Sequence, residues 1–127
     1  VYKTTVFAVC RWRNAHKPAG GLGPTGPVMP VRVITKPPTA ELKPNQKDQD
    51  TLPPYDVLDA ILSRYMEYDQ SAAEIVAAGY RQEDVDKVTR LIRLNEYKRR
   101  QSPPGIRVSR RAFGRDWRYP ITNGYRR

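Results

Sequence analysis

The sequence predicts a mainly α-helical chain with a lean core. Apolar residues recur at helical spacing through the middle of the chain, and helix start and stop signals flank these stretches. Only 39% of the 127 residues are hydrophobic, the mean hydropathy is −0.73, and there are 12 prolines. This composition is poor in core-forming residues for one domain of that length, so we expect long solvated segments or packing against another partner.

Residues 1–16 are predicted to form a short amphipathic helix. Tyr2, Val6, Val9 and Cys10 share one face, with Phe7 beside them. A cysteine in such a stretch is expected to be a buried structural thiol, and one Cys with one His gives too few ligands for a zinc site. The start lacks an initiator Met and the features of a signal peptide, so we expect the cut end of a longer protein.

Residues 17–52 are predicted to be mainly loops. Residues 17–30 are rich in Pro and Gly without either glycine-rich phosphate-binding motif, so a mobile loop is expected. The period of VRVIT at 31–35 is too short to separate a strand from a helical turn. For KPPTAELKPNQKDQD at 36–50, composition alone leaves both a disordered linker and a functional loop open.

Residues 53–102 are predicted to form three helices. The first, 53–68, opens on a Pro-Pro pair and repeats apolar residues at helical spacing, with Asp56 and Asp59 near its positive end. The second begins at Ser71, whose capping box with Glu74 satisfies two backbone N–H groups, and stops at Gly79. The third runs from about residue 82 to 102, with acids in its first turn and cations in its last, and two prolines end it.

Residues 103–127 read as an irregular basic tail. The net charge is +10, and between residues 98 and 127 there are ten Lys and Arg against one acid. Basic segments with interleaved aromatics can hold nucleic acid, nucleotides or an acidic protein surface, and the alternative is a solvated terminus. The aromatic residues of this segment are Phe113, Trp117, Tyr119 and Tyr125.

A basic helix-turn-helix module that binds nucleic acid is the alternative function. The second and third helices have its spacing, and the charge suits it. A recognition helix contacts base edges with its N-terminal residues, however, and here those residues are Glu83, Asp84 and Asp86. Phosphate would repel them, so nucleic acid is the less favoured partner. No stretch reaches the roughly 18 apolar residues of a membrane span.

Five stretches together resemble the C-terminal part of glutamine-dependent NAD synthetase. They are VYKTTVFAVCRWRN, ITKPPTAELKPNQKDQDTLPPYDVLDAIL, EIVAAGY, NEYKRRQ and AFGRDWRYPITN, and the similarity extends over nearly all of residues 1–127. The resemblance implies a mainly α fragment. It would be the C-terminal helical part of an α/β ATP-pyrophosphatase (adenine nucleotide alpha hydrolase-like) domain, with most of its parallel sheet missing.

The same resemblance implies part of an ATP-dependent ligase that amidates deamido-NAD to NAD through an acyl-adenylate, using ammonia from glutamine. It implies ATP and Mg²⁺ as co-substrate and ion of the full enzyme, no tightly bound cofactor in this chain, a homo-oligomer, and a cytoplasmic enzyme without a membrane partner. The chain contains no Ser-Gly-Gly-x-Asp-Ser loop for pyrophosphate and no glutaminase domain. We therefore expect no activity from this chain alone and no catalytic residue within it.

Four residues match ligand contacts of the family. Lys3 in VYKTT and Thr39 in PPTAEL match positions that contact ATP, whereas Tyr97 and Lys98 in NEYKRR match a pair that contacts deamido-NAD. The cations at 98–100 also complement the helix dipole, which is the alternative interpretation of Lys98. Thr39 is alternatively a turn residue.

No metal ligand is expected in this chain. We interpret Glu41, Asp48 and Asp50 as turn-forming and helix-capping acids rather than a Mg²⁺ cluster. The resemblance makes residues 36–50 a substrate-proximal loop, with 45–50 among its more mobile residues.

Overall fold

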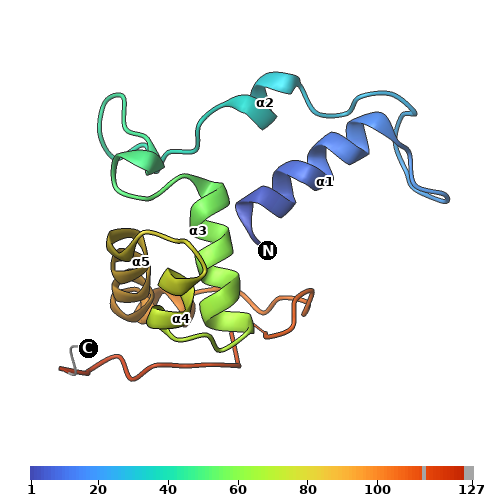
Figure 1. Cartoon of the computed structure of the whole chain (residues 1–127). Coiled ribbons are helices and arrows are strands. Elements are labelled where there is room, and N and C mark those ends of the chain that lie inside the picture. The colour runs from blue at the N-terminus through green and yellow to red at the C-terminus, as the bar shows by residue number, and fades with distance from the viewer. Residues whose placement is uncertain (113, 125–127) are drawn as a thin grey trace. The chain divides into compact units, whose positions relative to one another are not determined.

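The chain folds into helices joined by long irregular segments (Figure 1). The structure is a computed structural model that describes residues 1–112 and 114–124, and these ranges contain no β-strand, which confirms the mainly α prediction. The chain divides into two compact units, Val1–Asp56 and Val57–Arg127. Within the described residues, no helix has the length and apolarity that a membrane crossing requires.

The second unit has a small core between three helices. These are α3 (Tyr55–Leu62), α4 (Ala72–Ala77) and α5 (Gln82–Leu94). Ile61, Ile75 and Val85 are fully buried and Val88 is 1% exposed, so one residue from α3, one from α4 and two from α5 form its centre. Burying each such side chain contributes roughly 1.5–3 kcal/mol, which makes this cluster the main source of the unit's stability.

The predicted helix at 53–68 begins later than expected, and its backbone hydrogen bonds change from the α-helical to the π-helical pattern. It starts at Tyr55, after both prolines, and its α-helical part ends at Leu62. A π-helical turn follows over Ser63–Glu67, in which the N–H of Tyr68 reaches the carbonyl of Ser63 five residues earlier. Asp59 is buried at 7% exposure rather than serving only as a surface charge near the helix start.

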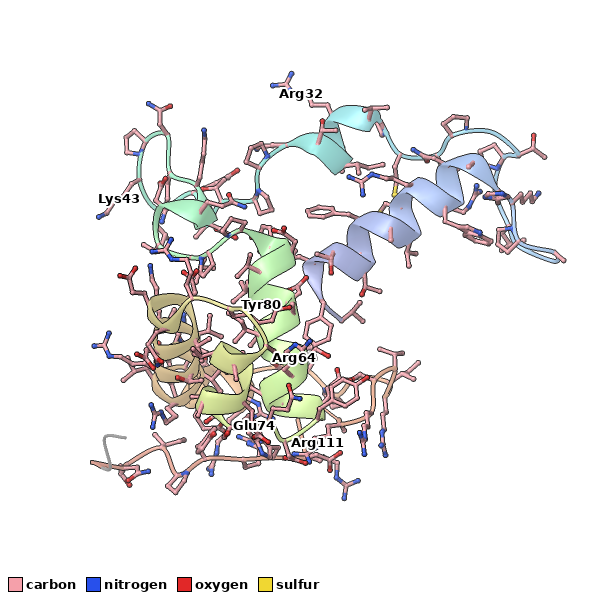
Figure 2. All side chains as sticks on the ribbon, viewed as in Figure 1. Arg32, Lys43, Arg64, Glu74, Tyr80 and Arg111 are labelled. Carbon is pink, nitrogen blue, oxygen red and sulfur yellow. The ribbon has the colours of Figure 1, made fainter. Side chains whose placement is uncertain are left out.

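Arg64 connects this π-helical turn to the segment that joins α4 and α5. Its guanidinium lies 5.5 Å from the centroid of the Tyr80 ring, and Nη1 donates to Oε1 of Gln70 at 3.0 Å. Figure 2 labels Arg64 and Tyr80. Tyr80 in turn packs against the buried cluster. Arg64 therefore contributes a cation–π contact and a hydrogen bond at the edge of the core.

The capping box of α4 forms as predicted. Ser71 Oγ accepts from the N–H of Glu74 at 3.3 Å, and Ser71 N donates to Glu74 Oε2 at 2.7 Å. The hydroxyl of Ser71 also donates to that carboxylate, and these bonds hold the pKa of Glu74 below its ordinary 4.5. Gly79 follows the helix at φ +100°, the left-handed conformation that a glycine stop supplies.

Replacing Ser71 with alanine should lower the free energy of unfolding by about 1 kcal/mol, because the start of α4 loses its cap. Because the pKa of Glu74 is lowered in the folded chain, its carboxylate stabilises the fold above pH 4.5. This stabilisation is lost as the pH falls through the lowered pKa. Urea unfolding followed by circular dichroism should show the difference at pH 7 and a smaller one in acid. Ser102→Ala, at an exposed position, is the control; equal losses in both variants would contradict the cap.

The predicted helix at 82–102 is interrupted at Asn95. α5 ends at Leu94, and a single turn, α6 (Glu96–Arg99), follows it. Asn95 Nδ2 donates to the carbonyl of Leu91 at 2.8 Å, and the N–H of Lys98 returns to the carbonyl of Asn95 only three residues earlier. The side-chain amide thus competes with the α-helical backbone pattern, and the prolines at 103–104 do not mark the helix end.

The first unit contains α1 (Lys3–Ala15) and the five-residue α2 (Val31–Thr35), which settles VRVIT as helix. No residue of α1 is buried: Val6 is 40% exposed, Val9 is 57% exposed, and Cys10 is half-buried. The short helix predicted here is confirmed, whereas the predicted burial of the Cys10 thiol is wrong. The reason is that α2, which packs on α1, is too short to cover it and buries only Ile34.

Asn14 fixes the end of the irregular loop at 17–30. Its Oδ1 accepts from the N–H groups of Val28 and Met29 at 3.0 and 2.9 Å, and its Nδ2 donates to the carbonyl of Met29 at 2.8 Å. Arg13 adds a hydrogen bond from Nη2 to the carbonyl of Pro24 at 2.9 Å. The loop is irregular as predicted, and the last residues of α1 hold it.

Replacing Asn14 with alanine should accelerate amide exchange at Val28 and Met29 about fivefold, since each net hydrogen bond is worth about 1 kcal/mol. Hydrogen–deuterium exchange resolved to these amides makes the measurement. Asn14→Asp keeps the accepting oxygen and should retain most of the protection. Unchanged exchange in the alanine variant would show that these bonds do not hold the loop.

Candidate functional site

Tyr97 and Lys98 lie together on the exposed side of α6. Tyr97 is 47% exposed, Lys98 is also exposed, and the Lys98 Nζ lies 6.0 Å from the centroid of the Tyr97 ring. An ammonium at this distance is within range of a cation–π attraction. One helical turn therefore presents a positive charge and a phenol to solvent side by side.

Glu96 and Arg99 bracket this pair and point the other way. They are 1% and 6% exposed, and Arg99 Nη1 donates to Glu96 Oε2 at 3.0 Å. Arg99 also donates to two backbone carbonyls of the tail, from Nη1 to Trp117 at 2.7 Å and from Nη2 to Asp116 at 2.8 Å. A buried charge needs such partners, and Arg99 has a carboxylate partner on α6 and two carbonyl partners in the tail.

Arg118 completes this buried network from the tail. Its Nε donates to Glu96 Oε1 at 2.5 Å and its Nη1 to the carbonyl of Gly114 at 2.7 Å. Burial by itself would raise the pKa of Glu96, but the Arg118 hydrogen bond, the Arg99 charge and the N–H of Tyr119 outweigh it and hold the pKa below 4.5. Glu96 is thus an ionised carboxylate whose two oxygens each face a different guanidinium.

Arg99 does lie in the last turn of α6, where the helix dipole favours a cation, but it also has specific partners. Its side chain turns into the protein and binds Glu96 and the tail. We name Glu96, Arg99 and Arg118 the α6 network.

The tail is irregular but is not a solvated terminus at residue 112 and residues 114–119. Trp117 packs edge-on against Tyr65 and Tyr119, with ring centroids 5.0 and 5.2 Å apart, and the two tyrosine hydroxyls are 3.0 Å apart. Burial, followed by the bond to Tyr65, raises the pKa of Tyr119. Two of the four tail aromatics are used for internal packing; Phe113 and Tyr125 lie outside the described residues.

Ion pairing and a turn hold the same segment in place. Arg111 pairs with Asp69, and the N–H of Ala112 donates to Asp116 Oδ2 at 2.7 Å. The guanidinium of Arg111 also lies 6.0 Å from the Trp117 ring. These contacts fix the segment that supplies Arg118 to the α6 network.

Thr39 lies in a loop of the first unit that surrounds a cleft of about 750 Å³. Three lysines line this cleft, and Figure 2 shows one of them, Lys43, projecting outward from the loop. Thr39 Oγ1 accepts from the N–H of Glu41 at 3.1 Å, so the turn role applies to its oxygen while its O–H remains a donor. The other two lysines are Lys36 and Lys47.

Lys3 is the first residue of α1 and is exposed. It does not line the cleft around Thr39, so the structure does not join the two predicted ATP contacts in one described site. Tyr97 and Lys98 are brought together, but they belong to the other unit. Of the four predicted residues, one pair is thus adjacent.

The loop acids hold turns. Asp50 Oδ2 accepts from the N–H of Lys47 at 2.8 Å, Asp48 Oδ2 accepts from the Tyr55 hydroxyl at 2.5 Å, and Glu41 pairs with Lys36 at 3.3 Å. Among the residues that the structure describes, no group of three or more His, Cys, Asp or Glu is placed to hold a metal ion. Each of the three carboxylates thus has a partner within the loop or at the start of α3.

The N-terminal turn of α5 is acidic, as the sequence indicates. Glu83 and Asp84 lie in that turn, and the nearby cation Arg81 pairs with Glu83 at 2.5 Å. Gln82 donates to Asp86 at 2.8 Å. The end of the helix that would enter a DNA groove therefore carries negative charge, which disfavours the helix-turn-helix alternative.

Sequence reasoning missed the α6 network and the anchoring role of Asn14. Glu96 and Arg99 do stand at the i, i+3 spacing of a helical ion pair, which was the available signal. Arg118 is 22 residues from Glu96 and had no local signal.

The chain resembles known proteins along almost its whole length. A family model described as NAD synthase matches residues 1–102. The glutamine-dependent NAD(+) synthetase of Xanthomonas campestris pv. campestris (strain 8004) is 59% identical over 98% of this chain and 21% of its own length. That of Acinetobacter baylyi (strain ATCC 33305 / BD413 / ADP1) is 57% identical over 99% of this chain and 22% of its own.

A solved structure agrees with these relatives. The glutamine-dependent NAD+ synthetase of Acinetobacter baumannii, in complex with adenosine diphosphate, superposes with a TM-score of 0.55 at 46% identity and covers 98% of this chain and 20% of its own. The chain thus spans about a fifth of the length of the proteins it matches. Since the family model covers most of the residues and the relatives nearly all, the chain belongs to the NAD synthase family.

Proposed function

We propose that the chain is part of an ATP-dependent ligase that amidates deamido-NAD to NAD with ammonia from glutamine. The observation that carries this proposal is the 59% identity, across 98% of the chain, to a glutamine-dependent NAD(+) synthetase. In the proposed reaction, the nicotinate carboxylate attacks the α-phosphorus of ATP and pyrophosphate leaves. Ammonia then attacks the acyl carbon of the resulting acyl-adenylate, and AMP leaves.

In this proposal, residues 1–127 are the C-terminal portion of the synthetase domain, with the α/β ATP-pyrophosphatase fold completed outside this chain. The exposed valines of α1, at 40% and 57%, support it because they offer apolar surface to further layers. The chain would supply a ligand-proximal loop and a helical segment, and the active enzyme would be a homo-oligomer. We expect no synthesis of NAD from the chain by itself.

We assign deamido-NAD to Tyr97 and Lys98. Their exposure and adjacency on α6 support the assignment, because a ligand can reach both at once. The ammonium would offset phosphate charge, and the phenol offers a ring face and a hydroxyl to the dinucleotide.

We assign ATP to Lys3 and Thr39. The cleft around Thr39 supports its part of the assignment, since three lysines against one carboxylate, Glu41, leave its lining net positive for phosphates. The Acinetobacter baumannii structure was solved with adenosine diphosphate, which agrees with an adenine nucleotide as ligand. We propose that Mg²⁺ arrives with ATP, bound to its phosphates, and that other parts of the enzyme supply its remaining ligands.

The test is an assay of the purified full-length enzyme with ATP, Mg²⁺, deamido-NAD and either glutamine or ammonium. Equal amounts of NAD, AMP and pyrophosphate are expected. With ¹⁸O in the nicotinate carboxylate, one label should appear in the phosphate of AMP, because that oxygen bridges the two groups in the acyl-adenylate. Absence of NAD would overturn the proposed function, and NAD formed with ADP and phosphate would overturn the adenylate route alone.

A further inference from the structure

We propose that Glu96 is a positioning residue for deamido-NAD, acting through Tyr97 and Lys98. This inference rests on the proposed function, since it concerns the same binding pair. The carboxylate of Glu96 is buried beneath an exposed binding turn and holds one guanidinium from that turn and one from the tail. It would therefore fix where the turn presents its ligand-facing side chains.

The shape of α6 explains why it needs such an anchor. A single four-residue turn has no stability of its own, because helix formation must first overcome an unfavourable nucleation step. Glu96 and Arg99 are three residues apart and share the buried face, so the residues between them face solvent. Whatever holds Glu96 and Arg99 thus sets the direction of Tyr97 and Lys98.

The helical backbone is broken at Asn95, directly before α6. Asn95, at φ −96° and ψ 11°, leaves the α-helical conformation and interrupts the backbone pattern between α5 and α6. The orientation of α6 is consequently not imposed by α5 alone. Glu96 and Arg99 bond to each other and each also bonds to the tail, and Glu96 is the one that accepts from Arg118.

The decisive variant is Glu96→Gln in the full-length enzyme. The amide keeps the shape of the carboxylate but loses its charge and one accepting oxygen. We expect the KM for deamido-NAD to rise by at least about tenfold, since displacements of about 1 Å at binding groups cost as much as a hundredfold. The KM for ATP and the rate of glutamate release from glutamine should stay near those of the unaltered enzyme.

A double-mutant cycle separates positioning from general stabilisation. If Glu96 acts through Lys98, then Glu96→Gln should add little to the rise in KM once Lys98 is alanine. If Glu96 only stabilises the fold, the two losses should add and the KM values for both substrates should move together. Additive losses would overturn the proposal.

Two further variants complete the design. Glu83→Gln makes the same chemical change at an exposed ion pair with Arg81 and should leave the KM for deamido-NAD unchanged. Arg118→Lys retains the charge but not the forked geometry, and we expect an intermediate rise in KM. This variant carries the test if Glu96→Gln does not fold; an unchanged KM there would overturn the proposal.

The outcomes distinguish this inference from the proposed function. If Lys98→Ala raises the KM for deamido-NAD and Glu96→Gln does not, positioning by Glu96 is wrong and the assigned ligand site stands. If Lys98→Ala itself changes nothing, the ligand assignment and the positioning role both fail. If the unaltered enzyme makes no NAD, the proposed function fails.

Discussion

Replacing Lys98 with alanine in the full-length enzyme should lower ammonia-dependent synthesis of NAD by about 10²–10³-fold, the range seen when one charge-stabilising donor is removed from an active site. The exposed ammonium beside Tyr97 is the group that we assign to a phosphate-bearing substrate. Glutaminase activity should be largely retained, because that reaction takes place in a different domain of the proposed enzyme. Steady-state rates of NAD formation with ammonium, compared with glutamate release from glutamine, give the measurement.

The matched control for this prediction is Lys87→Ala. Lys87 is an exposed lysine on α5, so its replacement removes the same charge from a helix of the same unit. Its NAD synthesis should stay close to that of the unaltered enzyme. Unchanged synthetase kinetics in the Lys98 variant would remove Lys98 from the site, and equal losses in both variants would point to net charge instead.

Replacing Arg99 with leucine should destabilise the second unit by about 3–5 kcal/mol, the cost of removing one member of a buried ion pair. Glu96 would keep only one of its two cations, and the carbonyls of Asp116 and Trp117 would lose their donor. Unfolding in guanidinium chloride, monitored by circular dichroism, would measure the change in the free energy of unfolding. Arg100→Leu, at the exposed neighbouring position, should cost far less, and similar losses would contradict the buried role of Arg99.

The pH dependence of this variant has a definite sign. Because the folded-state pKa of Glu96 lies below its ordinary 4.5, its contribution to stability is present above that pH and declines as the pH falls through the lowered value. Without Arg99 the pKa of Glu96 should rise, since one of the charges that lower it is gone. Acid unfolding of Arg99→Leu should therefore begin at a higher pH than that of the unaltered chain.

The features predicted from sequence are those whose causes are local. Ser71 and Glu74 stand three residues apart, and their hydrogen bonds need only the helix that they begin. Gly79 stops that helix through its own backbone freedom. The neighbouring positions of Tyr97 and Lys98 follow from chain adjacency, so their proximity was equally accessible to sequence reasoning.

The features that sequence reasoning missed depend on residues far apart in the chain. The charge pattern at the end of the third predicted helix suggested a favourable dipole, but Arg99 also meets carbonyls 17 and 18 residues later. The exposure of Val9 on α1 depends on how little of the helix α2 covers, which the period of the apolar residues does not reveal. The break at Asn95 reflects one side-chain amide competing for a backbone carbonyl.

The packing of Trp117 between two tyrosines makes its indole a spectroscopic reporter of tail docking. The chain has two tryptophans: Trp12 lies in the first unit, half exposed and stacked on His16, whereas Trp117 lies in the second. In a Trp12→Phe variant, Trp117 would be the one remaining source of tryptophan fluorescence. Its emission should shift to longer wavelength when the tail leaves Tyr65, so release of the segment that carries Arg118 becomes visible without any ligand.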